Sequence, residues 1–425
     1  MPAMRDDALA VLKRLREAKH VAYFAGGCVR DMLLGLEPAD YDIATSAPPP
    51  EVRRLFPITQ AVGAAFGVIL VRQGRSVIEV ATFRSDGKYS DGRRPDEVRF
   101  TSAEEDARRR DFTINGLFFD PIENKVIDFV GGQQDLAARR LRAIGDPQRR
   151  FAEDHLRLLR AIRFAARFAL AIDPPTGKAI LEAAPFLKGI SPERIAEELR
   201  MMFPPPTRKI AWPLLWEYHL AHVIFRLVPL PEGTSLDLKR SVFMELAPAM
   251  QVPFDLALAA ALLDVHLQSH PATDPRTALL RPQVVTFVRA MRQGLRLSND
   301  ESDAMEHELL SLGPLLTDAP ATLAMKKRFL AMPTAESSRR LMETLAAVGF
   351  FRQRIADLDA DFHTLADVDC APPPLITGDD LTAAGLNPGP PFKKALDAAY
   401  DAQLEGTIST RDQAMAMAMA MAKKG

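Results

Sequence analysis

Two aspartates alternate with a tyrosine in the segment "DYDIAT" at residues 40–45. If this segment is extended, Asp40 and Asp42 point to the same face, because side chains alternate along a strand. Two carboxylates held that close repel each other unless a cation lies between them, and hard oxygen ligands suit Mg²⁺. Asp-X-Asp is also common in surface turns, so the pair alone identifies no site.

A third acid makes the pair informative. Glu79 lies inside the apolar run "VIEVATF" at residues 77–83, where a lone carboxylate would be costly to bury. A carboxylate on a neighbouring strand would complete a site for two metal ions, which serves in-line phosphoryl or nucleotidyl transfer. We therefore expect Asp40, Asp42 and Glu79 to be catalytic, with Asp40 and Asp42 as ligands of two Mg²⁺ ions.

Two adjacent glycines stand just before these acids. Gly26 and Gly27 precede the predicted helix "VRDMLLG" at residues 29–35. Backbone N–H groups there can approach a phosphate closely, because no Cβ is in the way, and the helix dipole favours the anion. Arg30, on the first turn, can add a charge-assisted hydrogen bond. A lone Gly-Gly indicates only a turn, but its place in this order favours nucleotide binding.

The block "RRRDFTING" at residues 108–116 adds polar groups of the same kind. We expect Arg110 to contact phosphate, Asp111 to contact a ribose hydroxyl, and Asn115 to hold the loop or the nucleotide. Asp111 can also cap the helix that "FTING" predicts, and the two roles are compatible.

The segment "EDHLRLLRAIRFAAR" at residues 153–167 predicts one amphipathic helix. At about 100° per residue, its wet face holds one acid and several arginines. A carboxylate accepts from the exocyclic amino group of cytosine or adenine, and a guanidinium donates to the ring nitrogen beside it. Asp154 and Arg157 are therefore expected to select C and A over G and U, with Arg160 and Arg163 beside them in the nucleotide site. The alternative is an ordinary i,i+3 salt bridge between Asp154 and Arg157.

The elements that must position these residues form an α/β segment followed by helices. Apolar and β-branched runs predict strands, and "RQGRS" at residues 72–76 predicts a hairpin between two of them. Ser102 is the expected N-cap of a helix that begins at "SAEEDARRRD". After "IGDP" at residues 144–147, the strand signals nearly vanish and proline clusters separate helical segments. The expected strands are residues 21–24, 40–45, 66–71, 77–83, 116–120 and 125–130.

The composition is that of an ordinary soluble chain of more than one domain, with 47% hydrophobic and 26% charged residues among 425. No apolar run approaches the length of a membrane span. The N-terminal segment lacks the unbroken apolar core of a signal peptide, so we expect a cytoplasmic protein with no membrane partner. The two cysteines, Cys28 and Cys370, offer no disulfide framework. Nothing in the sequence indicates an oligomeric state.

The net charge of −1 conceals a strongly basic segment. Between Arg139 and Arg167 there are nine arginines and three acids, which gives a local charge of +6. A solvated helix face is one interpretation, and a phosphate-binding stripe is the other.

These blocks together resemble the class II branch of the polymerase-β nucleotidyltransferase superfamily, and most closely the bacterial CCA-adding enzymes (tRNA nucleotidyltransferases). Six motifs occur in the family's order: "GGCVRDMLLG", "DYDIAT", "VIEVATFR", "RRRDFTING", "IGDP" and "EDHLRLLRAIRF". The similarity is close over the first 200 residues or so and looser beyond, although "ITGDDLTAAGLNPGP" at residues 376–390 resembles the family's tail signature.

The resemblance implies an elongated multidomain architecture, with an α/β nucleotidyltransferase head followed by an all-α neck, body and tail. The implied domains are a catalytic head at 1–145, a neck with the templating helix at 146–205, an RNA-binding body at 206–335 and a tRNA-binding tail at 336–425. The implied reaction adds C, C and A to the 3′ end of tRNA from CTP and ATP and releases pyrophosphate.

The resemblance also implies roles for the residues within these motifs. One Mg²⁺ ion would activate the primer 3′-hydroxyl, and the other would hold the triphosphate. The implied roles are metal ligands for Asp40 and Asp42, third acid for Glu79, triphosphate contacts for Gly27 and Arg30, phosphate and ribose contacts for Arg110 and Asp111, and amino-acid template for Asp154 and Arg157.

Three alternatives remain open. Bacterial poly(A) polymerases share the head but typically carry a basic pair where "VGAAFGVILV" (residues 62–71) has Ala64 and Ala65. Partial enzymes add only C or only A, and the A-adding type lacks a flexible loop; the polar segment 84–100 is interpreted as that loop. A non-catalytic RNA-binding protein is disfavoured, because all three carboxylates remain.

Two further segments carry no predicted chemistry. In "ALLDVHLQSH" at residues 261–270, Asp264 and His266 stand in the wrong order for an HD-type phosphohydrolase, so we expect no second metal centre. The Ala-Met run near the C-terminus predicts a frayed helix.

Overall fold

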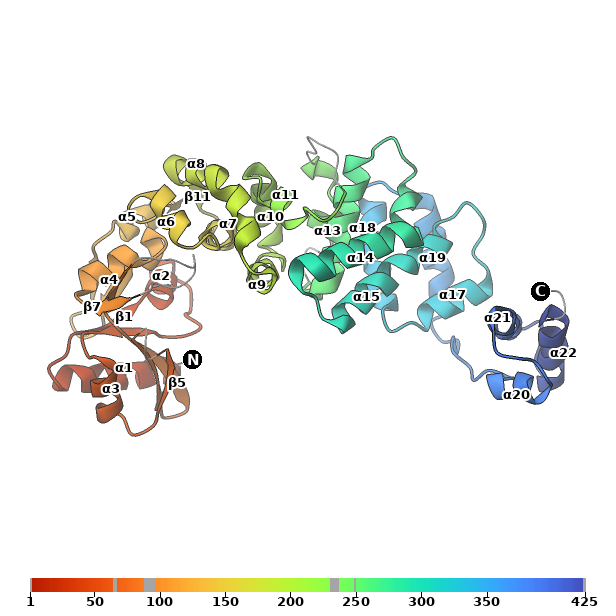
Figure 1. Cartoon of the computed structure of the whole chain (residues 1–425), viewed down its shortest axis with the longest axis horizontal. Helices are drawn as coiled ribbons and strands as arrows, with labels where there is room; N and C mark the ends of the chain where they lie inside the picture. Colours follow the sequence, from red (N-terminus) through yellow and green to blue (C-terminus); the bar gives the residue numbers. More distant parts are fainter. Residues whose placement is uncertain (1, 64–66, 88–96, 230–236, 248–249, 423–425) are drawn as a thin grey trace. The chain divides into compact units, whose positions relative to one another are not determined.

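The computed structural model describes residues 2–63, 67–87, 97–229, 237–247 and 250–422. It divides into two compact units, Met1–Ile224 and Phe225–Gly425, and Figure 1 labels many of their elements. The boundary lies inside segment 206–335, and the finer division into head, neck, body and tail stays a prediction.

A seven-stranded mixed sheet forms the centre of the first unit, in the order β3-β4-β5-β2-β1-β8-β9. Strands β2 and β5 run parallel, and the other neighbouring strands are antiparallel. The predicted hairpin is confirmed, because Gln73 of β4 pairs with Ser76 of β5. The strands of the sheet are β1 (Ala22–Ala25), β2 (Ile43–Thr45), β3 (Thr59–Gly63), β4 (Val68–Gln73), β5 (Ser76–Thr82), β8 (Leu117–Asp120) and β9 (Lys125–Asp128).

Two short strand pairs lie outside this sheet. They are β6 (Arg84–Asp86) with β7 (Val98–Phe100), and β10 (Arg140–Leu141) with β11 (Ala171–Ile172). Strand β11 is the one strand that the described residues contain beyond "IGDP", so the predicted change to helices is confirmed. The pair Ala64–Ala65 and residues 88–96 of the predicted loop lie outside the described residues.

Among the described residues, five helices and a 3₁₀ turn accompany the sheet. Helix α1 packs against β1, β2, β4 and β5, and its Leu12 and Leu15 are fully buried. Ser102 caps α4 as predicted, since its hydroxyl accepts from the Glu105 N–H group. These elements are α1 (Pro2–Glu17), α2 (Gly27–Leu33), α3 (Pro49–Leu55), α4 (Ala103–Arg109), η2 (Thr113–Asn115) and α5 (Gly132–Ala137).

The single helix predicted over residues 153–167 is wrong. Helix α6 ends at Glu153, the chain is extended at Asp154 (φ −153°, ψ 105°), and α7 begins at Arg157. The apolar side of α7 is buried as its period predicted, and α9 and α10 pack against it. The rest of the unit consists of α6 (Pro147–Glu153), α7 (Arg157–Phe168), α8 (Pro174–Ala183), η3 (Ala184–Gly189), α9 (Pro192–Met202), α10 (Arg208–Glu217) and α11 (Leu220–Ile224).

In its described residues, the second unit contains helices and no strands. Asp264 of α13 is fully buried, and its carboxylate accepts from the Ser241 hydroxyl, the Val242 N–H group and the Gln268 amide; this is a structural role. The elements are η4 (Leu238–Arg240), α12 (Val242–Glu245), α13 (Phe254–Ser269), η5 (Pro275–Leu279), α14 (Arg281–Leu295), α15 (Asn299–Leu310), α16 (Leu312–Leu315), α17 (Leu323–Leu330), α18 (Ala335–Ala347), α19 (Arg352–Thr364), α20 (Gly378–Ala383), α21 (Pro390–Leu404) and α22 (Arg411–Ala422).

The Ala-Met run is a packed helix, so the prediction of a frayed end is wrong for residues 411–422. Ala414 and Ala418 of α22 are buried in a small core with Leu381 and Ala395. The small alanine side chains let α22 lie closely against α21. Every helix of the described chain is too short or too polar to cross a lipid bilayer.

Candidate functional site

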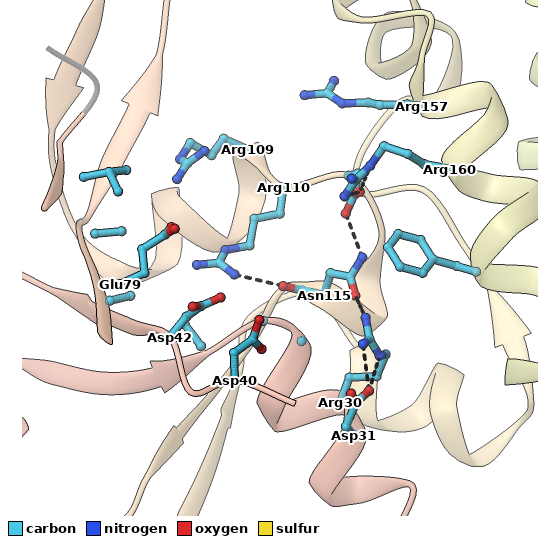
Figure 2. A pocket seen from close by; sticks show the side chains of 18 of the residues that line it. Arg30, Asp31, Asp40, Asp42, Glu79, Arg109, Arg110, Asn115, Arg157 and Arg160 are labelled. Atoms are coloured by element: carbon cyan, nitrogen blue, oxygen red, sulfur yellow. Dashed lines mark hydrogen bonds and ion pairs between the residues drawn. The ribbon is translucent and has the colours of Figure 1, made fainter. Parts of the chain in front are cut away.

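A cavity of about 740 Å³ opens in the first unit, and Figure 2 shows the side chains around it. Its volume is in the range of small-molecule sites. It brings together every site residue that the sequence predicted: Gly26, Gly27, Arg30, Asp40, Asp42, Glu79, Arg110, Asp111, Asn115, Asp154, Arg157, Arg160 and Arg163.

The Asp-X-Asp pair lies immediately before β2 in the chain. The predicted strand 40–45 is shorter in the structure, because β2 begins at Ile43. Asp42 nevertheless keeps the strand pairing, since its C=O accepts from the Ala25 N–H group at 3.0 Å. The extended backbone points Asp40 and Asp42 toward the same space (Figure 2).

The register of the parallel pair places Glu79 beside Asp42. Ile43 is opposite Val80, and both are fully buried. The preceding residues of the two strands therefore project together from the other face of the sheet. Strand β5 alternates buried and exposed residues, and Glu79 is on its exposed side, facing the cavity.

The three carboxylates concentrate negative charge. Burial, followed by the charges of Glu79 and Asp40, raises the pKa of Asp42 to about 7. Partial burial and the Asp40 charge also raise the pKa of Glu79. Arg110 opposes both shifts. Among the described residues, no three His, Cys, Asp or Glu side chains form a ready metal cage. The donor set still suits a hard divalent cation, which would relieve this repulsion.

Arg110 is fixed above the glycine turn by an acid that the sequence analysis missed. Its Nε and Nη2 donate to Asp106 Oδ2 at 3.2 and 3.0 Å, and its Nη1 donates to the Asn115 carbonyl at 3.1 Å. Gly26 has φ 68°, and a Cβ there would lie 2.8 Å from Arg110 Nη1. Its backbone conformation favours glycine, and a Cβ there would displace the end of the Arg110 side chain. The spacing of Asp106 one helical turn before the arginines is a signal that could have revealed it.

Arg30 lies deep in the cavity wall, with only 5% of its surface exposed. Its Nε donates to Asp31 Oδ1 at 2.8 Å, and its Nη1 donates to Asn115 Oδ1 at 2.6 Å. The guanidinium lies 4.3 Å from the centre of the Phe168 ring. Burial lowers the pKa of Arg30, and the neighbouring Asp31 opposes that shift. Arg30 thus joins α2 to the turn that carries Asn115.

Asp111 connects this turn to helix α7. Its Oδ1 accepts from the Phe112 N–H group at 2.8 Å and from Asn115 Nδ2 at 3.0 Å, and its Oδ2 accepts from Arg160 Nε at 2.9 Å. Burial alone would raise the pKa of Asp111, but the Arg160 guanidinium and these hydrogen bonds hold it well below its usual range. The side chain is therefore a fixed anion at the cavity edge.

The predicted template residues have separate partners. Asp154 Oδ1 accepts from the Leu156 N–H group at 3.0 Å, and Asp154 Oδ2 accepts from Arg194 Nη2 at 2.8 Å. Arg157 pairs with Glu153. The alternative of an ordinary salt bridge between Asp154 and Arg157 is therefore wrong. Both side chains line the cavity, Asp154 from the interruption between α6 and α7 and Arg157 from the first turn of α7. No pattern in the sequence pointed to Arg194, which is 40 residues further along.

Helix α9 supports α7 through a second ion pair. Arg163 Nε lies 3.3 Å from Glu198 Oε2, one helical turn from Arg194 on the same face of α9. Burial raises the pKa of Glu198, while Arg163 opposes the rise. Arg194 and Glu198 of α9 thus hold Asp154 and Arg163, respectively.

Comparison with known proteins agrees with this geometry. Residues 22–142 match the model of the Poly A polymerase head domain, and residues 169–232 match that of the probable RNA and SrmB-binding site of polymerase A. The three clustered acids and the head match together define a nucleotidyltransferase of the polymerase-β superfamily.

The relatives narrow the class. The CCA-adding enzyme of Lacticaseibacillus paracasei is 32% identical over 391 residues, which cover 92% of this chain and 89% of the relative. The chain belongs to the CCA-adding enzyme family. The CCA-adding enzyme of Geobacillus stearothermophilus is 42% identical over 213 residues, 50% of this chain and 52% of the relative; that match spans about half of its length. The crystal structure of the Bacillus stearothermophilus CCA-adding enzyme in complex with CTP aligns over 99% of both chains, with 28% identity and a TM-score of 0.73.

Proposed function

We propose that this protein adds C, C and A to the 3′ end of tRNA, using CTP and ATP and releasing pyrophosphate. One observation carries the proposal: the cavity that holds Asp40, Asp42 and Glu79 also holds Asp154 and Arg157. Acids suited to nucleotidyl transfer thus share one space with a pair that can distinguish bases. A tRNA substrate implies a cytoplasmic location.

Asp40 and Asp42, with Glu79 nearby, would hold two Mg²⁺ ions, which would neutralise negative charge on the triphosphate and lower the pKa of the attacking hydroxyl. The protein's own groups do the positioning. Arg110, fixed by Asp106, faces the phosphates above Gly26. The turn at Gly26 and Gly27 leaves the backbone open on that side. Attack of the RNA 3′-oxygen on the α-phosphorus forms one P–O bond and breaks another, with pyrophosphate as leaving group.

Sugar and base are read on the other side of the cavity. Asp111 is held as an anion by Arg160 and would accept from a ribose hydroxyl. The Asp154 carboxylate keeps oxygen lone pairs beyond its bonds to Leu156 and Arg194, so it can accept from an exocyclic amino group. Arg157 would donate to the adjacent ring nitrogen. Guanine and uracil present the opposite polarity and would leave these groups unpaired.

The test is incorporation into tRNA that lacks its last three nucleotides. We would supply CTP alone, ATP alone and both, and resolve the products to single nucleotides. We expect two C residues with CTP, and CCA with the mixture. A product that stops after C, or one that needs a C-ended primer and gains only A, would indicate a partial enzyme. No incorporation in the presence of Mg²⁺ would support the RNA-binding alternative.

Poly(A) polymerase is a second candidate because residues 22–142 match a poly(A) polymerase head. The same assay separates the two functions. Long A tails with ATP alone would favour the polymerase, whereas a product that ends at a single A favours CCA addition. The head alone does not decide between them, because both activities use the same acids.

A further inference from the structure

Nine arginines line the cavity, and eight of them have a carboxylate partner. On helix α7, Arg157, Arg160 and Arg163 pair with Glu153, Asp111 and Glu198. Their charges are therefore largely balanced within the protein. Such arginines hold their neighbours in place and offer less net charge to a ligand.

Arg167, in the last turn of α7, is the ninth. It is exposed and lines the cavity. Its contact within the described residues is with the ring of Phe168, whose centre lies 5.1 Å from the guanidinium carbon. No carboxylate of the described chain pairs with it. Arg167 therefore presents all its N–H donors and an unbalanced positive charge to the cavity.

Its surroundings are positively charged as well. Phe164 and Phe168 stack with their centres 6.3 Å apart, and four guanidinium groups lie over these two rings: those of Arg30, Arg160, Arg163 and Arg167. Burial is the first reason why the pKa values of Arg30 and Arg163 are lowered, and repulsion from Arg167 adds to it. The aromatic faces offset part of this repulsion, and a bound anion would offset the rest.

We propose that Arg167 binds a phosphate group of the substrate. The proposal rests on the proposed function, since that function brings phosphates into the cavity. Arg30 already donates hydrogen bonds to Asp31 and Asn115, so fewer of its N–H groups remain to bind an anion directly. Two sources share the required chemistry: the triphosphate of the incoming nucleotide and the phosphodiester next to the RNA 3′ end.

The experiment compares the full-length Arg167→Ala and Arg167→Lys variants with the wild type. Arg53→Ala is the matched control, because Arg53 is an exposed arginine of α3 outside this cavity. Dissociation constants are measured for CTP and for inorganic pyrophosphate without RNA, and for tRNA lacking its last three nucleotides without nucleotide. Thermal unfolding checks that each variant is folded.

Loss of one charge-assisted phosphate contact should weaken binding by roughly tenfold or more. Arg167→Lys should recover part of that loss, because it keeps the charge, and Arg53→Ala should leave all three constants unchanged. Weaker binding of CTP and pyrophosphate identifies the triphosphate. Weaker binding of tRNA alone identifies the phosphodiester. If a folded Arg167→Ala variant binds all three ligands within twofold of the wild type, the proposal is wrong.

These measurements need no turnover, so they separate the two hypotheses. A wild-type protein that binds CTP but adds nothing to tRNA would contradict the proposed function. It would leave the phosphate-binding result for Arg167 intact.

Discussion

Asp106 offers a sharp test of how the site is held together. Its side chain has 2% of its surface exposed, and it pairs with both Arg109 and Arg110. Its Oδ1 also accepts from the Arg84 N–H group at 3.3 Å. Asp106→Asn keeps the shape but removes the charge that both guanidinium groups face. Arg110 then retains its charge without its buried anion, whereas Arg109 keeps Asp86 at 3.7 Å.

The loss of folding stability caused by Asp106→Asn can be estimated from the exposed fractions of these side chains. Removing one partner of a fully buried ion pair costs about 3–5 kcal/mol. The Arg109 and Arg110 side chains keep 20% and 18% of their surface exposed, so water replaces part of the lost interaction, and we expect a loss of about 2 kcal/mol. Once released, Arg110 should turn toward Asp42 and Glu79, with whose charges it already interacts. It would then compete with Mg²⁺ for those carboxylates.

Two assays follow from this reasoning. Denaturant unfolding should show the loss of stability, and nucleotide incorporation against Mg²⁺ concentration should show a higher Mg²⁺ requirement. Glu104→Gln is the control on the same helix, because the exposed Glu104–Arg108 pair contributes only about 0.5 kcal/mol. A variant with unchanged stability and an unchanged Mg²⁺ requirement would refute the assignment of Asp106 as the group that restrains Arg110.

Further predictions concern chemistry, base choice and stability. Asp42→Asn should reduce nucleotide incorporation by about 10³-fold or more, because a charged metal ligand is lost. CTP binding measured without metal should persist. Normal incorporation would contradict the role of Asp42 as a metal ligand. Asp154→Ala should admit UTP or GTP more than it changes the Mg²⁺ requirement, and an unchanged preference for C and A would refute the template. Burial raises the pKa of Glu308 from 4.5 to about 8, so the folded state holds a proton that the unfolded chain releases. The contribution of the protonated Glu308 side chain to the free energy of unfolding is complete below pH 4.5 and is lost as the pH rises through about 8. Glu308→Gln should flatten that decline in unfolding experiments. Ala418→Asp should lower stability by about 2–3 kcal/mol, because Ala418 is fully buried; unaltered unfolding would show that α22 contributes little.

Local patterns were sufficient to predict most of the head. The hairpin into β5 is fixed by its turn residues, and it appears in the structure. The Ser102 cap was readable for the same reason. The break at Asp154 was not, because the 3.6-residue pattern of residues 153–167 continues through it. Only tertiary contacts, such as the bond from Arg194, show why the chain leaves the helix there.

The same distinction between local patterns and tertiary contacts applies to the candidate site. Residues whose chemistry depends on near neighbours, such as Asp40 and Asp42, were predictable from spacing. Residues that act through distant partners were not, because periodicity carries no information about contacts between separate elements. Asp111 illustrates this: its neighbours in sequence indicate a cap, but Arg160, 49 residues away, holds its charge. The Ala-Met helix was misjudged for the converse reason, since low complexity concealed a regular small-residue face.

The ion pairs around the cavity bear on the base selection that we propose for Asp154 and Arg157. Asp154 and Arg157 are held by Arg194 and Glu153, which come from different helices, α9 and α6. A shift of α9 relative to α7 would therefore act on the Asp154 carboxylate through Arg194, while Arg157 keeps its partner Glu153. Cytosine and adenine differ in size but share the same donor–acceptor order. A site that adjusts one reading group while the other stays fixed can accommodate both bases without losing the polarity that excludes guanine and uracil.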